Sequence, residues 1–313
     1  MEGTLTGWKF NNIPSWVNKL GDMFLEAKSY DTDYIKYAVG GLIGEKIYAV
    51  GQGTGGARVV ASYNTRTNEW SDENPGTSDA KSLFAGATVG TKVYTLGGNG
   101  YGSSTDYSLT ECYDSASKTW STKKNMTGIR YGHSATSIGT NIHCIGGQNK
   151  ATNFLKTHEV YSTTGNTWTT KPDSLVEVTR CTICNDGTNI YQLGGYGWSG
   201  STTDQHTYNV KYDTVSETWT KLSYMPNDAE GGGSVYHDGK VYHFGGGRGL
   251  NADSLHSTVF IYDIASNKWT TSVATTKNGK LRCFAVNVNG SAYIVGGAGT
   301  SSDLSKKLDV YIM

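Results

Sequence analysis

Proline is scarce, charge is low and long apolar runs are missing from this sequence of 313 residues. Only 4 prolines occur, which excludes a collagen-like or proline-rich disordered chain. The 27 basic and 27 acidic residues cancel, so the basic surface typical of nucleic-acid-binding proteins is not expected. No stretch approaches the roughly 18 consecutive apolar residues of a membrane-spanning helix. We therefore predict no nucleic-acid partner and no membrane insertion.

The N-terminus and the cysteines give no sign of secretion or of metal binding. Met1 to Thr4 lack a basic region followed by an apolar core, which predicts a cytoplasmic protein. The 5 cysteines form an odd, scattered set, unlike a disulfide framework. Cys181 and Cys184 are spaced as Cys-x-x-Cys, but positions three apart in a strand point to opposite faces. We interpret both as packing residues and predict no metal and no cofactor.

Glycine and aromatic residues are abundant, and they recur at a regular spacing. The chain has 41 glycines, and 12% of its residues are aromatic. Tryptophans at positions 70, 120, 168, 219 and 269 are 48 to 51 residues apart, and each lies seven residues after a tyrosine. Glycine pairs follow the same period, with Gly51-Gln52-Gly53 as a degenerate first copy: Gly97-Gly98, Gly146-Gly147, Gly194-Gly195, Gly245-Gly246 and Gly296-Gly297. The chain therefore contains six repeats.

The repeats predict strands, and their motif points to a known family. Short segments bounded by turn residues are typical of strands, and helical periodicity is missing within the repeats. A period near 50 residues, with a glycine pair, a tyrosine and then a tryptophan, resembles the kelch repeat over about residues 35 to 313. This resemblance implies an all-β, six-bladed β-propeller of four-stranded antiparallel blades, with residues 1–313 forming a single domain.

The motif residues have expected places in such a propeller. We expect the glycine pairs where neighbouring backbones approach closely, because a side chain would clash there. Tyrosine and tryptophan are expected to fill the gaps between blades. A tyrosine lies three residues before the glycine pair in five repeats, and only His143 interrupts this series, so we interpret it as a packing substitute rather than a catalyst.

The sixth repeat ends at Met313 without a tryptophan or a fourth strand. Thr4-Leu5-Thr6-Gly7-Trp8 resembles the tryptophan strands, so residues about 4 to 10 are predicted to complete the last blade and close the ring. One short helix is predicted near residues 16–27, where apolar residues are spaced for a single face. This helix either covers one propeller face or docks a partner.

Candidate ligand-binding residues lie where two classes of loop meet on one face. Arg180 and Arg282 each lie fourteen residues before their glycine pair, at equivalent positions near the channel mouth. Arg130 lies sixteen residues before its pair and matches the arginine that commonly opens a kelch repeat. Guanidinium groups suit carboxylates and sugar hydroxyls, although structural bonds to loop carbonyls are the alternative. The predicted ligand-binding residues are Arg130, Tyr131, Arg180, Arg282, Tyr101, Tyr107, Tyr196, Trp198 and Arg248.

These features favour recognition over catalysis. No metalloprotease, nucleophile-elbow or phosphate-loop motif occurs, so no catalytic residue is assigned. We predict a non-enzymatic module that binds a protein or a glycan through one propeller face. One alternative is a receptor-binding or structural component of a phage tail or similar adhesive particle, incorporated into a larger assembly. The other alternative is a carbohydrate-active enzyme of the sialic-acid mutarotase type, because kelch propellers include enzymes.

Overall fold

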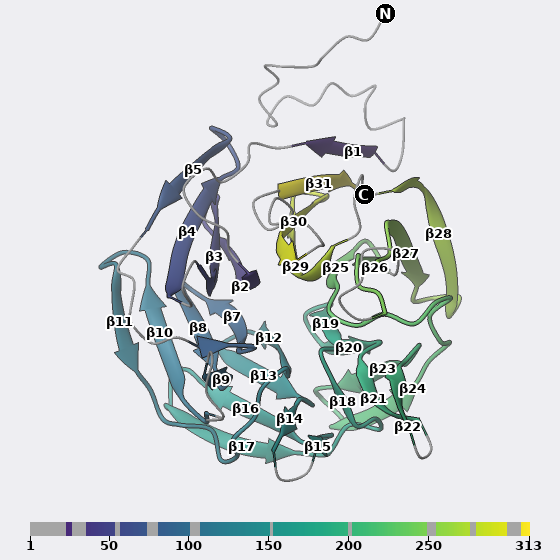
Figure 1. The fold of residues 1–313 in the computed structure, drawn as a ribbon, viewed down its shortest axis with the longest axis horizontal. Coiled ribbons are helices and arrows are strands. Elements are labelled where there is room, and N and C mark those ends of the chain that lie inside the picture. The colour runs from purple at the N-terminus through teal and green to yellow at the C-terminus, as the bar shows by residue number, and fades with distance from the viewer. Residues whose placement is uncertain are drawn as a thin grey trace, which may run out of the picture.

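Six four-stranded antiparallel sheets surround a central axis, so the chain is a six-bladed β-propeller (Figure 1). The structure is a computed structural model, and it describes residues 23–26, 36–53, 57–73, 81–100, 107–150, 153–199, 202–248, 255–275, 280–298 and 308–313. Within these ranges there is no helix, and so none that could cross a membrane. The all-β propeller predicted from the repeats is confirmed.

Each blade has four strands that run in order from the axis to the rim. The first two blades are β2 (Lys36–Ile43), β3 (Lys46–Gln52), β4 (Arg58–Asn64), β5 (Glu69–Asp72), and β7 (Ala85–Val89), β8 (Lys92–Leu96), β10 (Thr110–Asp114), β11 (Thr119–Thr122). The next two are β12 (Ser134–Ile138), β13 (Asn141–Ile145), β16 (His158–Ser162), β17 (Thr167–Lys171), and β19 (Thr182–Asn185), β20 (Asn189–Leu193), β23 (Asn209–Asp213), β24 (Thr218–Lys221). The last two are β25 (Gly233–His237), β26 (Lys240–Phe244), β27 (Thr258–Asp263), β28 (Lys268–Thr275), and β29 (Leu281–Val288), β30 (Ser291–Ala298), β31 (Leu308–Ile312), β1 (Met23–Glu26).

Short additional strands extend from three blades on one side of the ring. β6 (Lys81–Ser82) pairs with β9 (Asn99–Gly100), and β14 (Gln148–Asn149) pairs with β15 (Asn153–Phe154). β18 (Val178–Thr179), β21 (Tyr196–Ser199) and β22 (Thr202–Gln205) form a three-stranded sheet beside the fourth blade. These extensions give the loops that follow the second strands a hydrogen-bonded frame.

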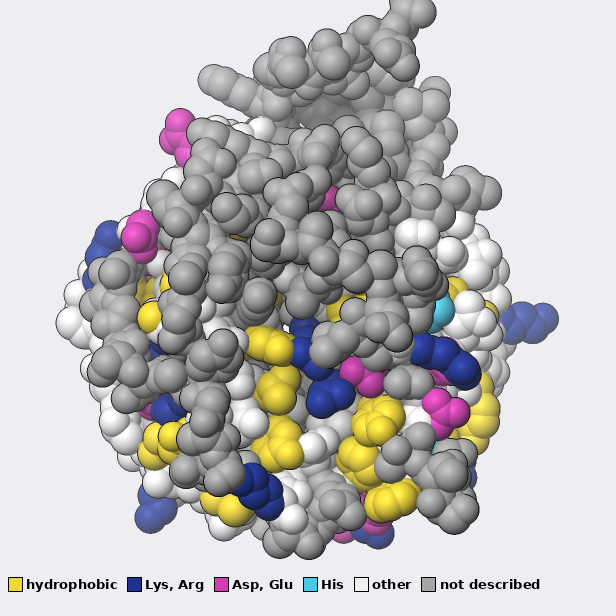
Figure 2. Space-filling model, in the orientation of Figure 1, with side chains coloured by type: hydrophobic (Ala, Val, Ile, Leu, Met, Phe, Trp, Pro, Cys, Tyr) yellow, Lys and Arg dark blue, Asp and Glu magenta, His cyan; other side chains and the backbone are white. Residues whose placement is uncertain are grey.

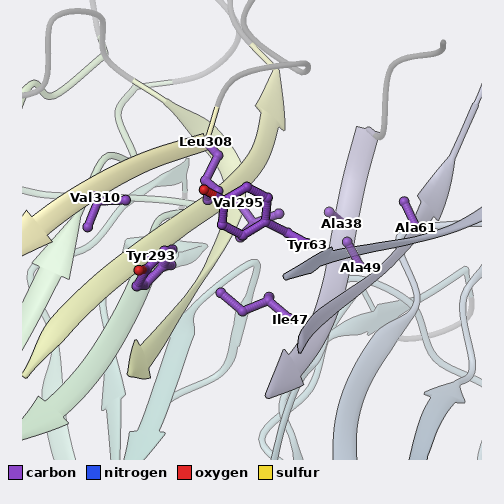
Figure 3. Packing of buried hydrophobic residues seen from close by; sticks show 9 residues of the cluster. All are labelled: Ala38, Ile47, Ala49, Ala61, Tyr63, Tyr293, Val295, Leu308 and Val310. Carbon is purple, nitrogen blue, oxygen red and sulfur yellow. The ribbon is translucent and has the colours of Figure 1, made fainter. Parts of the chain in front are cut away.

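Aromatic rings join each blade to the next. The second-strand aromatic of one blade packs on the third-strand tyrosine of its neighbour, at centroid distances of 5.9 to 6.5 Å in all six junctions. The same tyrosine also packs on the tryptophan of its own blade in five blades, at 5.0 to 5.4 Å. His143 takes the tyrosine place in the third blade and contacts Tyr212. Its predicted packing role is confirmed. Figure 3 shows the junction of the last and first blades, where Tyr63 lies beside Val295 and Leu308.

The glycine pairs lie where successive blades touch through their backbones. The second glycine donates its N–H to a carbonyl of the next blade's entry loop, as in Gly147 to Val178 at 2.8 Å and Gly246 to Lys280 at 2.7 Å. A Cβ atom on Gly146 would lie 2.6 Å from the Val178 carbonyl oxygen, which no real side chain tolerates. The predicted close approach of neighbouring backbones is confirmed.

The ring is closed by an N-terminal strand, but not by the predicted residues. β1 pairs antiparallel with β31 and supplies the fourth strand of the last blade, with Phe24 opposite Tyr311 in the register. This is the place that Trp70 holds opposite Tyr63. The prediction that residues about 4 to 10 complete the blade is therefore wrong, and those residues lie outside the described part of the chain. The helix predicted near residues 16–27 is also wrong at residues 23–26, which form β1; the rest of that range is not described.

A covalent spacing explains the first error. Between the tryptophan of one blade and the third-strand tyrosine of the next the chain is continuous, so its length is restricted. From Trp70 to Tyr113 this spacing is 43 residues, from Phe24 to Tyr63 it is 39, and from Trp8 it would be 55. The number of residues counted from the tryptophan of one blade to that of the next is not restricted across the two chain ends, because no peptide bond joins them. The helix prediction used only the local spacing of apolar residues. It failed because residues 23–26 instead pair with the backbone groups along the edge of β31, which this spacing does not reveal.

Candidate binding face at the channel mouth

The inner strands of the six blades line a central channel of about 360 Å³. Because strand direction alternates, the loops after the second strands and the loops between blades meet on one face, at one mouth of this channel. Figure 2 shows this face, with Lys and Arg side chains at its centre and hydrophobic side chains beside them. We call it the loop face.

A collar of six equivalent residues surrounds the mouth. All six have a left-handed backbone, with φ between 53° and 68°: Tyr37, Leu83, Gly132, Arg180, Gly231 and Arg282. Four backbone hydrogen bonds join five consecutive members, from Leu83 to Arg282. They include Gly132 to Leu83 at 2.7 Å and Gly231 to Arg180 at 2.8 Å. Left-handed geometry costs little for glycine, but it costs a residue with a side chain about 1 to 2 kcal/mol. The collar therefore holds four side chains at the mouth at some cost in stability.

The two glycines of the collar lie against the stems of the two arginines. A Cβ on Gly231 would lie 3.3 Å from Cγ of Arg282, and one on Gly132 would lie 3.6 Å from Cγ of Arg180. Each arginine stem therefore lies over the glycine of the preceding blade. At Gly132 the atom nearest to an added Cβ would be Oγ1 of Thr179, at 2.3 Å, so this glycine makes room for Thr179, whereas Gly231 lies tightly against Arg282 itself.

Arg282 is held by an aromatic residue rather than a carboxylate. Its Nη1 donates to the Tyr37 hydroxyl at 2.6 Å, and its guanidinium carbon lies 4.7 Å from the centre of the Tyr37 ring. Burial lowers the pKa of Arg282, and the neighbouring charge of Arg180 lowers it further. No described carboxylate lies within 4.0 Å of its guanidinium nitrogens. Tyr37 and the nearby carboxylate of Glu230 oppose this shift of the pKa, and an arginine remains charged under these conditions.

Arg180 is anchored between a carboxylate and an aromatic ring. Its Nη1 donates to Oε1 of Glu230 at 3.1 Å, and Glu230 is buried. Its guanidinium carbon lies 6.0 Å from the ring centre of Tyr196 on the other side. The buried carboxylate fixes the position of Arg180, while about a quarter of its side chain (26%) stays exposed at the mouth.

An aromatic cluster continues from Arg180 toward the rim. Phe154 of β15 packs edge-on against both Tyr196 and Trp198 of β21, at centroid distances of 5.5 and 5.8 Å. Trp198 is 43% exposed, which is high for a large apolar side chain. Contacts thus connect Tyr37 with Arg282, and Arg180 with Tyr196, Phe154 and Trp198, while the two arginines are near enough for their charges to repel. We call these six residues the mouth-to-rim strip.

Arg130 does not join the other two arginines. It lies two residues before the collar position, and its guanidinium turns into the third blade, where it is buried in an ion pair with Glu159. Its Nη1 also donates to the carbonyls of Gly146 and Thr157, at 3.3 and 3.1 Å. Arg130 therefore makes structural bonds to carbonyls, the alternative to ligand binding that we gave for the arginines.

The other predicted residues are spread over the loop face. The Tyr131 hydroxyl accepts a hydrogen bond from Gln148 at 2.5 Å, and the Tyr107 ring lies 5.3 Å from Nζ of buried Lys81. Arg248 is exposed and pairs with Asp228. Tyr101 lies outside the described residues.

The sequence contains a signal for the site residues that the prediction missed. The fourteen-residue spacing that located Arg180 and Arg282, applied to the first two repeats, gives Tyr37 and Leu83. Glu230 is marked only by its place before Gly231, and nothing in the sequence marks Phe154 as the partner of Trp198.

The remaining polar groups of the described chain do not form a metal site. No cluster of three His, Cys, Asp or Glu side chains able to hold a metal ion occurs among the residues described. Cys181 and Cys184 are free, buried and part of two different apolar clusters, as expected for packing residues on opposite strand faces.

Comparison with known proteins decides the family. A model of the KLHDC2/KLHL20/DRC7 Kelch-repeats domain matches residues 84–297, which is more than half of the chain. The chain belongs to the Kelch-repeat family. The kelch resemblance inferred from the glycine, tyrosine and tryptophan spacing is thereby confirmed.

Relatives of this kelch propeller include much longer proteins. It is 25% identical over 239 residues to Kelch-like protein 23 of Homo sapiens, covering 76% of this chain and 41% of that protein. It is 29% identical over 177 residues to Kelch-like protein 36 of Mus musculus, covering 55% of this chain and 28% of the relative. The chain thus spans less than half the length of these relatives. A solved structure titled "Structure of YjhT" superimposes with a TM-score of 0.75 at 14% identity, over 91% of this chain and 96% of that one. That similarity shows the fold alone.

Proposed function

We propose that this kelch propeller is a non-enzymatic module that binds a protein through the mouth-to-rim strip of its loop face. The observation that carries the proposal is the presence on one face of two contact groups, Tyr37 with Arg282 and Arg180 with Tyr196, Phe154 and Trp198. Two partly exposed arginines lie at one end of the strip and an exposed tryptophan at the other. Arg, Tyr and Trp are the residues that most often dominate the energy of protein interfaces.

The rigidity of the strip supports a recognition role. Tyr196 and Trp198 lie on β21, which is hydrogen-bonded on both sides by β18 and β22. The backbone hydrogen bonds of the collar hold the two arginines. Side chains already in place lose little conformational entropy on binding, so more of the interaction energy contributes to affinity.

A selection from random peptides displayed on phage tests this proposal. Peptides selected on the intact protein are expected to bind the Arg282→Ala variant more weakly by about 2 to 5 kcal/mol, with an unchanged melting temperature. The Arg180→Ala, Arg282→Ala double variant should bind them at least as weakly, but its melting temperature should fall because Glu230 is left buried without its cation. Trp198→Ala is expected to weaken the same peptides. The matched control is His237→Ala with Asp238→Ala, in a turn between first and second strands on the other face, which should leave affinity unchanged.

The same experiment separates the competing functions. A glycan array that gives specific binding, while no peptide is enriched, would replace the protein ligand by a sugar. Sugar isomerisation by the purified protein would overturn the non-enzymatic assignment. Loss of peptide binding in the control pair, with the arginine variant unaffected, would place function on the opposite face.

A further inference from the structure

A second group of aromatic side chains lies in the fourth blade, outside the mouth-to-rim strip. Tyr208 directly precedes β23, and its ring stacks on that of His206, with centroids 4.5 Å apart and an angle of 26° between the planes. Tyr224, in the loop after β24, meets Tyr208 edge to face, at 6.0 Å and 79°. The two tyrosine rings therefore form two walls of a corner.

This corner lies on the opposite side of β21 from the strip. Successive residues of a strand point to opposite faces, so Gly197 faces away from Tyr196 and Trp198. A Cβ added to Gly197 would lie 3.3 Å from Nε2 of His206, which places the imidazole on the Gly197 face. Asp204 of β22 pairs with Gly197, so its side chain points to the same face.

Tyr224 presents an aromatic surface to solvent. Its side chain is 52% exposed, the largest exposed fraction of any aromatic residue in the described part of the chain. The face of an aromatic ring carries partial negative charge and attracts cations, most strongly where a second ring or an anion lies beside it. Tyr208 provides the second ring, because its plane is nearly perpendicular to that of Tyr224.

Carboxylates provide the negative charge. Burial lowers the pKa of His206 below its ordinary value of 6.5, and Asp204 and Asp228 are near enough to oppose this shift. The imidazole is therefore neutral near neutral pH. Arg248 donates from Nε to Asp228 at 2.7 Å, and Asp204 also acts on its charge. Two carboxylates and one guanidinium give this group of residues one more negative than positive charge.

We propose that this site, the acidic-aromatic corner of Asp204, His206, Tyr208, Tyr224 and Asp228, binds a basic side chain of the protein ligand. The cation lies against the Tyr224 ring, and the two carboxylates favour it over a neutral or anionic group. This inference rests on the proposed function and adds a contact beyond the strip. The partner then reaches past β21 toward the fifth blade.

Small molecules test the chemistry without the natural ligand. Butylammonium reproduces the end of a lysine side chain, 1-butanol is its neutral analogue, and methyl glucoside represents a sugar. Each is titrated at constant ionic strength, and the ring signals of Tyr208 and Tyr224 are followed by NMR. Butylammonium is expected to shift both sets of signals saturably, whereas 1-butanol and methyl glucoside are not.

A matched pair of aromatic variants tests the walls of the corner. Tyr224→Leu is expected to weaken butylammonium about fivefold, measured on the Tyr208 signals, because it removes the aromatic face but keeps an apolar side chain. Trp198→Leu removes an exposed aromatic residue from the other side of β21, and it should leave butylammonium affinity unchanged.

A matched pair of charge variants tests the electrostatics. Arg248→Gln is expected to strengthen butylammonium binding about threefold, because Asp228 loses its paired cation. Lys156→Gln changes the net charge of the protein by the same amount, but it removes the partner of Glu177 in a different part of the loop face. This control should leave the affinity unchanged.

The outcomes distinguish this inference from the proposed function. No saturable shift with butylammonium, or an equal shift with 1-butanol, overturns the inference. Tighter binding of methyl glucoside also overturns it and makes the corner a sugar site. Weaker butylammonium binding by the Arg248 variant contradicts the assigned electrostatics. If the selected peptides need Trp198 and Arg282 but bind the Tyr224 variant normally, the proposed function stands and only the corner falls.

Discussion

The ring of Tyr293 in the last blade packs on that of Tyr63 in the first, with centroids 6.1 Å apart. This contact repeats the one that Tyr48 makes with Tyr113 one blade further on, at 6.4 Å. The junction between the two ends of the chain therefore uses the same aromatic contact as the junctions within it. Because each blade packs only on its neighbours, a weak junction anywhere in the ring is expected to lower the stability of the whole propeller.

Gly146→Val is expected to destabilise the propeller by about 3 kcal/mol or more, because its Cβ would overlap the Val178 carbonyl oxygen of the next blade. Gly139→Ala is the control. Its φ of 59° is also left-handed, but nothing lies within 4 Å of an added Cβ, so it should cost only about 1 kcal/mol. Equal costs in urea unfolding would contradict the role assigned to the glycine pairs.

Removing residues 1–26 is expected to destabilise the protein by about 2 to 4 kcal/mol relative to removing residues 1–22. The two truncations differ only in β1, which pairs with β31 over four residues, and a net hydrogen bond contributes about 1 kcal/mol. Thermal melts of the two proteins provide the comparison. Identical melting temperatures would show that β1 does not close the ring.

Arg130→Ala is expected to cost about 3 to 5 kcal/mol, because it leaves Glu159 buried without its cation. Replacing both residues by valine should recover most of this loss. In the fourth blade Val178 and Val210 occupy the equivalent positions and pack in one apolar cluster. Chemical denaturation measures both effects; a double variant as unstable as Arg130→Ala would contradict the assignment of a purely structural pair.

Acid is expected to weaken the junction of the third and fourth blades. His143 Nδ1 and His158 Nε2 are 3.0 Å apart, and His158 packs on Tyr212. Burial lowers the pKa of His143 to about 4 and that of His158 to about 3, from an ordinary value of 6.5. The unfolded chain therefore binds protons that the folded chain does not, and stability present above pH 6.5 is lost as the pH falls toward these values.

A double variant isolates this effect from the other buried histidines. His143→Tyr with His158→Val places in the third blade the residues found in the first, Tyr48 and Val60. Each histidine contributes about 1.4 kcal/mol per pH unit while only the unfolded chain is protonated. The melting temperature of the variant should fall less steeply than that of the original protein between neutral pH and pH 4. Parallel curves would show that the pair does not carry the acid sensitivity.

The repeat pattern predicted the blades because every blade makes the same contacts. Tyr161 and Trp168 pair within a blade, and Gly146 meets the next blade, in a form that recurs about every 50 residues. Sequence spacing records such contacts directly. Phe24 shares neither the residue type nor the spacing expected across the chain ends, and only pairing with β31 identifies its segment as a strand.

For the binding face, the sequence by itself determined that Arg180 and Arg282 are equivalent, because their distance from the glycine pair is a property of one repeat. It could not separate them from Arg130. A shift of two residues along the strand entry turns a guanidinium from the channel mouth into the buried interior beside Glu159. Only the tertiary structure brought Tyr37 to Arg282, 245 residues apart, because the ring closes in space and not along the chain. The sequence therefore specified what each blade contains, and the closure of the ring decided which side chains meet at its axis.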